Sequence, residues 1–479
     1  MKNNIPFILG IAIIASSCAV GPDYHRPAAV AKLPDDWRWQ SANPRDGQSP
    51  LHWWSVYQSP ELSRLEELAL GNNQDLLAAI SRVDQARAIA RIQGAEFFPQ
   101  LGAKPQYKRQ RFSKNNPQYQ QLGPLAADSV LPATTDSFMV ALDLGYEMDL
   151  WGRVRRAFES ASAQAAASAA ECNHITLTLT ADVAARYFAL RQYDIELQIL
   201  RDTVDTRRRS LRLTQRRLQV GRSTALDVRQ AETALVLAES DLAETEQNRA
   251  QTQNALAVLC GQTAPDFALA EDAALPEIPE VPARLPADLL ERRHDIAAAE
   301  RMMAAKNAEI GVAIAAYFPV LTLTGQAGYF SASASDLFNW PSSLWSIGPT
   351  VSLPLFTGGR TIAQVRESRA AYESAVASYR ATVLNAFRDV EDALAARHFL
   401  ARRAKAISCA VRSSSAALVL SEKRYLAGQV SYSEVTDAQR AELAIRRAQT
   451  AVQAQQLHAT LRLIKALGGG WDKMDGRDG

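Results

Sequence analysis

The groups that could do chemistry in this sequence are acidic residues that follow two widely separated glycines. Glu434 and Asp437 come after Gly428 and are spaced three residues apart, which places both carboxylates on one face of a helix. Asp227 follows Gly221 by the same number of residues as Glu434 follows Gly428. Carboxylates gathered in this way attract cations. The alternative is that they are an ordinary solvated helix face.

Catalytic and metal-binding motifs are missing from the sequence. Six histidines and four cysteines are scattered singly, without a CxxC, HExxH, GxSxG or GxxxxGK[ST] pattern. With 53 basic and 51 acidic residues the net charge is +2, which is too even for a nucleic-acid-binding chain. We therefore expect no catalytic residue, no metal site and no cofactor, and a protein that is not an enzyme.

The N-terminus has the pattern of an export signal. Lys2 precedes an apolar run over residues 5–14, and Ala15-Ser16-Ser17 leads to Cys18. The run is shorter than the ~20 residues that span a bilayer. A cysteine at the cleavage site resembles a bacterial lipobox, in which acyl chains on Cys18 anchor the mature N-terminus to a membrane. The alternative is an ordinary signal peptide with an incidental cysteine.

The chain contains one unit twice. Residues 75–99 match residues 295–319 at an offset of 220, and residues 152–261 match 359–468 at an offset of 207. The 13 extra residues of the first copy lie between 99 and 152, where we expect an exposed loop. The predicted organisation is a signal peptide (1–17), a lipidated N-terminal segment (18–60), a first repeat (61–261), a Pro-rich linker (262–284), a second repeat (285–468) and a C-terminal tail (469–479).

Each copy contains a pair of long helices. Residues 153–220 hold no Pro or Gly, and apolar positions spaced four and three apart predict a coiled-coil helix about 100 Å long. Gly221 ends it, and a second helix is expected from about Thr224 to Cys260. The second copy repeats the pattern over 360–427 and from just after Gly428 to Gly468. Alone, such helices would also suit a cytosolic coiled-coil scaffold.

Four segments alternate with a period of two, which predicts strands. They cover residues 101–107, 138–150, 321–329 and 344–356. One apolar and one polar face per strand is the pattern of transmembrane barrels, with a soluble β-sandwich as the alternative. Four strands are too few to close a barrel, and open edges are not tolerated in lipid. We therefore expect several chains to contribute four strands each.

Several motifs together are specific. They are Cys18-Ala-Val-Gly-Pro-Asp-Tyr24, Leu285-Pro-Ala-Asp-Leu-Leu-Glu-Arg-Arg293 with Asp295-Ile296, Tyr317-Phe318-Pro319, Gly358-Gly359-Arg360, and Gly428 with Ser431. On these motifs nearly the whole chain resembles the bacterial outer membrane efflux protein family, the TolC-like channels, and most closely its NodT-type lipoprotein branch. His294 stands where a proline usually begins a helix. We expect little effect, because proline there only pre-sets the first turn.

The resemblance implies a mixed membrane protein. Three identical chains would form a twelve-stranded outer-membrane β-barrel above a coiled-coil periplasmic tunnel, with a lipid on Cys18. The implied function is the exit duct of a tripartite efflux system, which passively conducts solutes or drugs from a periplasmic adaptor and an inner-membrane pump, commonly of the RND class. Alternatives are a duct for metal-ion efflux or type I protein secretion, and a non-conducting envelope lipoprotein. No nucleic-acid partner is implied.

The resemblance also places the periplasmic entrance at the two glycine breaks. The adaptor would dock at a tip formed by these residues: Gly221, Arg222, Ser223, Gly428 and Ser431. A constriction would combine Tyr425 with carboxylate rings from Asp227, Glu434 and Asp437. Such rings select cations and repel one another, so we expect some of their pKa values to be raised. Val430 stands where the best-known member has an arginine, which puts the family's gate salt bridge in doubt. Arg222 is the candidate to supply the missing cation of that salt bridge. A simple helix break is the alternative for both glycines.

Overall fold

The computed structural model describes residues 19–28, 37–38, 52–111, 113, 134–281 and 292–469. They form two compact units. The first contains the described residues within 1–27, 84–166 and 301–377, and the second those within 28–83, 167–300 and 378–479. Cys18, most of the predicted loop after residue 111 and the predicted tail beyond residue 469 lie outside the described residues.

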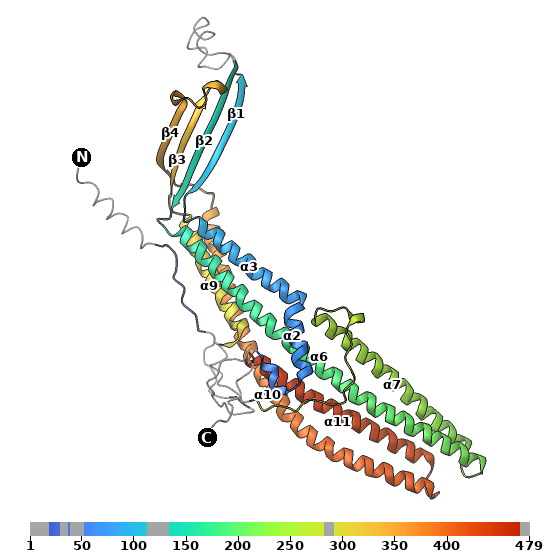
Figure 1. Cartoon of the computed structure of the whole chain (residues 1–479). Coiled ribbons are helices and arrows are strands. Elements are labelled where there is room, and N and C mark those ends of the chain that lie inside the picture. Colours follow the sequence, from blue (N-terminus) through green and yellow to red (C-terminus); the bar gives the residue numbers. More distant parts are fainter. Residues whose placement is uncertain are drawn as a thin grey trace, which may run out of the picture. The chain divides into compact units, whose positions relative to one another are not determined.

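Four long helices follow the internal repeat. α6 (Arg153–Gln219) and α10 (Arg360–Leu426) have 67 residues each, and α7 (Ala225–Leu259) and α11 (Tyr432–Ala466) have 35 each. At 1.5 Å per residue the longer pair extends about 100 Å. These bounds confirm the predicted helices and the two equivalent copies. In the second unit the four helices run side by side, with both connecting turns at the same end (Figure 1).

Shorter helices complete each copy. They are η1 (Trp53–Tyr57), α2 (Pro60–Asn72), α3 (Gln74–Ala95), η2 (Ala264–Asp266), α9 (His294–Ala315), η4 (Ala334–Asp336) and η5 (Trp340–Ser342). Helix α9 begins at His294, as expected for a position where proline is dispensable. Among the helices of the described residues, none combines the length and the apolar content that a membrane span requires.

The first unit contains an antiparallel sheet in chain order. Its strands are β1 (Gln100–Arg111), β2 (Thr134–Met148), β3 (Val320–Ser331) and β4 (Ser343–Ser352). All four predicted strands are confirmed, with different ends: β1 extends to Arg111, β2 runs from Thr134 to Met148, and β4 is shorter than expected. The last strand ends at Ser352 rather than near Phe356, although the alternation continues, because its partner β3 begins at Val320, opposite Ser352.

The strand register gives the sheet one apolar and one polar face. One row across the four strands is Leu101, Leu144, Gly325 and Ile347, and the next row is Gly102, Asp143, Gln326 and Ser346. On the polar face Gln326 Nε2 donates to Asp143 Oδ1 at 2.8 Å. The apolar face is exposed at Leu101, Tyr107, Val140, Leu142, Trp345, Ile347 and Val351. Within the described chain the outer edges of β1 and β4 have no partner strand.

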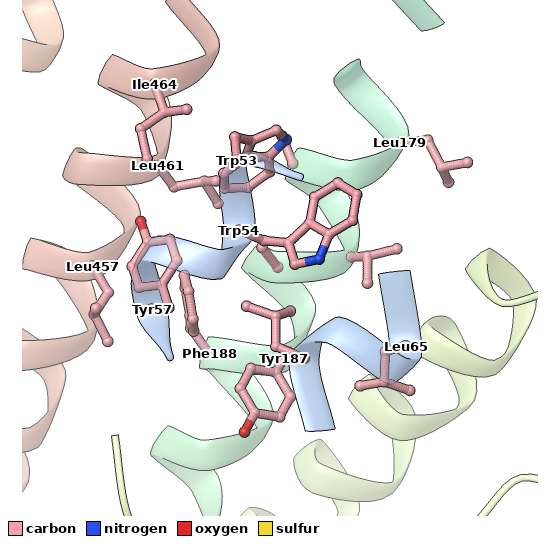
Figure 2. Close-up of a cluster of buried hydrophobic side chains, with 14 of the residues drawn as sticks. Trp53, Trp54, Tyr57, Leu65, Leu179, Tyr187, Phe188, Leu457, Leu461 and Ile464 are labelled. Carbon is pink, nitrogen blue, oxygen red and sulfur yellow. The ribbon is translucent and has the colours of Figure 1, made fainter. Parts of the chain in front are cut away.

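A large apolar core holds the two copies together in the second unit. Figure 2 shows Trp53, Trp54 and Tyr57 between side chains of α6, such as Phe188, and side chains of α11, such as Leu457. The indole of Trp53 donates to Thr180 Oγ1 at 3.1 Å, so its polar atom is satisfied inside the core. The segment before α2 therefore fixes α6 against α11 and positions the long helices that lead to the turns.

Candidate functional site

The two turns that join the long helices, 220–224 and 427–431, have the same backbone geometry, and we call them the tip turns. Gly221 and Gly428 have φ angles of 71° and 75°, in the left-handed region that favours glycine. The N–H of Arg222 donates to the carbonyl of Arg217 at 2.7 Å, and the N–H of Gln429 donates to that of Arg424 at 2.9 Å. Both turns are Schellman motifs, so the glycines end their helices for a backbone reason.

After the first tip turn, Asp227 caps its own helix. Its backbone N–H donates to Thr224 Oγ1 at 3.1 Å, and its carboxylate accepts from the Thr224 N–H at 2.9 Å and from Ser223 Oγ at 2.8 Å. This arrangement is a capping box, which satisfies N–H groups at the start of α7. Ser431, the counterpart of Thr224, accepts no such bond, and its hydroxyl pairs with Ser433 at 2.6 Å.

The pKa of Asp227 is lowered, whereas raised pKa values were expected for some of the three carboxylates in the assembled protein. Burial by itself would raise it, but the hydrogen bonds from Thr224 and Ser223, together with the charge of Arg217, hold the pKa below 3.8. The expectation assumed that repulsion between carboxylates dominates. Within one chain the capping contacts dominate, because each favours the ionised form.

Glu434 occupies the position equivalent to Asp227 but makes a different contact. Its carboxylate accepts from Arg424 Nη1 at 2.9 Å, which ties the start of α11 to the last turn of α10. Arg222, the substitute we considered for a gate salt bridge, is exposed and makes no ion pair with any residue that the structure describes. Sequence reasoning missed Arg424, although its place ten residues before Glu434 at the end of a helix was a usable signal.

Tyr425 lies at the centre of an aromatic cluster between the two helix pairs. It is 7% exposed and meets Tyr432 edge-on, with ring centroids 5.3 Å apart. The guanidinium of Arg217 lies 4.8 Å from the centroid of the Tyr425 ring, within cation–π range. Ala231 of α7 and Val435 of α11 complete the cluster. The end of α6 therefore contacts the end of α10 through Tyr425.

Known proteins share the sequence pattern of this chain over nearly its whole length. Residues 65–262 and 285–469 match the family described as "Outer membrane efflux protein". The chain belongs to the outer membrane efflux protein family. It is 37% identical over 480 residues to outer membrane protein OprJ of Pseudomonas aeruginosa, covering 97% of this chain and 95% of that protein. It is also 34% identical to the toluene efflux pump outer membrane protein TtgI of Pseudomonas putida, covering 96% of this chain and 97% of that one.

Solved structures show the same fold. A membrane protein from Pseudomonas aeruginosa superposes with a TM-score of 0.85 at 34% identity, covering 95% of this chain and 98% of that chain. The open state of the Neisseria gonorrhoeae MtrE outer membrane channel superposes with a TM-score of 0.81 at 28% identity, covering 95% and 98%. This efflux protein therefore has the fold of the TolC-like outer membrane channels, acts in efflux and resides in the outer membrane.

The structure of this efflux protein brings together only some of the predicted site residues. Tyr425, at the end of α10, and Glu434, at the start of α11, flank the second tip turn. Arg217 contacts the Tyr425 ring, and Arg424 pairs with Glu434. Asp437 is exposed one turn further along α11, with Arg440 Nη1 3.9 Å away. Sequence reasoning also missed Tyr432 and Arg217, which both contact the Tyr425 ring.

Proposed function

We propose that three copies of this efflux protein form a passive exit duct, with a shared β-barrel and a periplasmic coiled-coil tunnel. The observation that carries the proposal is the sheet, which has an exposed apolar face and no partner at either edge among the described residues. Copies that continue the sheet would satisfy the edges and turn the apolar face to lipid. A stable monomer in native mass spectrometry of the detergent-solubilised protein would overturn this assembly.

The proposed partners are a periplasmic adaptor, docked at the tip turns around Gly221, Arg222, Ser223, Gly428 and Ser431, and an inner-membrane pump of the RND class. Small apolar solutes or drugs are the proposed cargo. The names of relatives support this class, since they include toluene, solvent and antibiotic efflux pump proteins of Pseudomonas putida. No catalytic group or cofactor is needed, because the duct only conducts.

The proposed constriction combines the Tyr425 cluster with carboxylates of Glu434 and Asp437, and with Asp227 nearby in its capping box. Exposed acidic side chains repeated by symmetry would form rings that select cations. The exposure of Asp437, whose side chain is 75% accessible, supports its access to a lumen. In this chain the Arg424–Glu434 ion pair would replace the family's gate salt bridge, whose arginine position is occupied by Val430.

Planar-bilayer recording tests the constriction. The double variant Glu434→Gln/Asp437→Asn should have weaker cation selectivity and less block by multivalent cations than the parent, most clearly at low salt. The matched control is Asp75→Asn/Asp84→Asn, which removes two exposed carboxylates from α3. Parent-like selectivity and block in the first variant would show that Glu434 and Asp437 are an ordinary solvated face.

We also propose that Cys18 carries the lipid anchor. The segment that follows it is held in the first unit, where the N–H of Val20 donates to the Trp151 carbonyl at 2.9 Å and Asp23 pairs with Arg156 at 2.6 Å. Trp151 lies between the end of β2 and the start of α6, so Val20 lies beside the end of the sheet. Clickable fatty acid should label the parent and not Cys18→Ser. Label in both would refute the assignment.

A further inference from the structure

The part of α6 next to the first tip turn carries a strong positive charge that the equivalent part of α10 lacks. Residues 206–226 contain seven arginines and no acidic residue, whereas the equivalent residues 413–433 contain one lysine, one arginine and one glutamate. The counterparts of Arg209, Arg212 and Arg216 are Ala416, Val419 and Lys423. Because the two copies share a fold, the backbone does not require this difference.

Three of these arginines form a stripe, which we call the arginine stripe: Arg209, Arg212 and Arg216. Spacings of three and four residues place them on one helical face. All three are exposed. Among the residues that the structure describes, none makes an ion pair, and the only side-chain partner is Thr206, which accepts from Arg209 at 3.2 Å. Their neighbour Arg208 differs, since Glu239 neutralises it at 2.9 Å.

An apolar cavity lies next to the arginine stripe. It has a volume of about 220 Å³ and lies between α6, α10 and α11 of the second unit. Leu213, Leu426 and Val435 supply apolar walls, Arg209 borders one side and Glu422 another. Leu213 and Leu426 are 44% and 55% exposed, so the cavity is accessible from solvent. A cavity of this size accepts one branched or aromatic side chain.

We propose that the arginine stripe and this cavity together dock an acidic amphipathic helix of the periplasmic adaptor. One apolar side chain of that helix would fill the cavity, and carboxylates spaced three or four residues apart would face Arg209, Arg212 and Arg216. The occupant is assigned by charge complementarity, because three unneutralised cations beside an apolar cavity fit an acidic rather than a basic helix. The inference rests on the proposed function, which takes the adaptor to be the partner at this end.

The position of the stripe agrees with this assignment. Arg216 precedes Gly221 by five residues and Arg209 by twelve, so the stripe lies within about 20 Å of the first tip turn. The equivalent face of α10 is apolar at Val419, which is 51% exposed. The two helix pairs therefore offer different surfaces, and an adaptor helix can distinguish one from the other.

A binding measurement with the full-length trimer tests the proposal. The probe is the purified adaptor of the pump with which the channel restores efflux in cells. Arg209→Gln/Arg212→Gln/Arg216→Gln should weaken adaptor binding roughly 3- to 100-fold at low salt, mainly through a slower association rate. The difference should shrink as added salt shortens the screening length to about 10 Å at 0.1 M.

Matched controls separate this effect from a general loss of charge. Arg64→Gln/Arg87→Gln/Arg201→Gln also removes three exposed arginines, each of which is ion-paired in the structure, and should bind the adaptor like the parent. Charge reversal of the stripe to glutamate should be rescued by Glu→Lys or Asp→Lys changes in the adaptor helix. Bilayer conductance of the triple glutamine variant should equal that of the parent.

The outcomes distinguish this inference from the function on which it rests. Unchanged adaptor affinity in the triple variant, with a conducting parent that binds the adaptor, overturns the inference alone. A triple variant that dissociates into monomers in native mass spectrometry overturns it too, because the stripe then contacts a neighbouring copy. A parent that neither conducts nor binds overturns the proposed function and the inference together.

Discussion

The contacts of Tyr425 should hold the ends of the long helices together more strongly than the ion pair beside it. Tyr425→Ala removes a ring that is 93% buried, its edge-on contact with Tyr432 and its cation–π contact with Arg217. Truncating a buried aromatic side chain costs roughly 3–5 kcal/mol. Arg424→Gln breaks a pair whose side chains are 46% and 43% exposed, which is worth at most about 1 kcal/mol.

Hydrogen exchange measured by mass spectrometry reports this difference in free energy between the two variants as a difference in amide exchange rates. For amides of residues 211–222 and 424–436, Tyr425→Ala should speed local exchange roughly 10²- to 5 × 10³-fold, and Arg424→Gln less than about fivefold. Tyr425→Phe is the matched control. The Tyr425 hydroxyl is buried and has no hydrogen-bond partner in the described chain, so removing it should leave exchange unchanged or slower.

The ranking of the variants is the test of the reasoning. If Arg424→Gln speeds exchange as much as Tyr425→Ala, the ion pair and not the aromatic cluster joins the helix ends. If Tyr425→Phe matches Tyr425→Ala, the hydroxyl carries the contact through a partner, and the burial argument fails.

Three further changes test buried or capping charges in the second unit. Both carboxylate oxygens of Glu66 are buried without a partner in the described residues, and burial raises its pKa well above 4.5. Glu66→Leu should therefore stabilise the protein by roughly 1–3 kcal/mol near neutral pH, measured by thermal unfolding. The gain should be smallest below pH 4.5, where Glu66 is neutral in both states, and should widen as the pH rises toward its folded pKa. Asp194 is fully buried between Arg191, at 2.8 Å, and Arg249, at 2.6 Å, so Asp194→Asn should cost about 3–5 kcal/mol in the same assay, and a loss under 1 kcal/mol would contradict the pairing. Asp227→Ala should cost about 1 kcal/mol of helix capping, seen as faster exchange over residues 225–232. In the parent this contribution is present above pH 3.8 and is lost as the pH falls through the lowered folded pKa, so a protection that does not depend on pH between 5 and 2 would refute it.

Local patterns in the sequence predicted the elements because each has a local physical cause. The helix ends at Gly221 and Gly428 follow from a left-handed backbone position, and the strand faces follow from a period of two, which the rows through Leu144 and Asp143 confirm. The side-chain contacts across the turns were not predictable in this way. Glu434 and Asp227 occupy equivalent positions, yet one reaches Arg424 and the other caps its helix.

The same limit explains what was missed in the packing. Trp53 packs against helices more than a hundred residues away, and no periodicity in its neighbourhood indicates which helix it joins. The lowered pKa of Asp227 was not foreseen, because carboxylate repulsion was considered without the hydrogen bonds from Thr224 and Ser223. The residues that matter at the tip turns were therefore predictable as a region, and their individual contacts required the structure.

Single-channel recording of the purified protein in planar bilayers tests the central claim, passive conduction, most directly. The parent should form discrete conductance steps without any energy source, and Tyr425→Ala should conduct more than the parent because its helix ends are no longer held together. If both proteins insert into the bilayer and neither shows discrete conductance, the account is contradicted and a structural envelope lipoprotein is favoured.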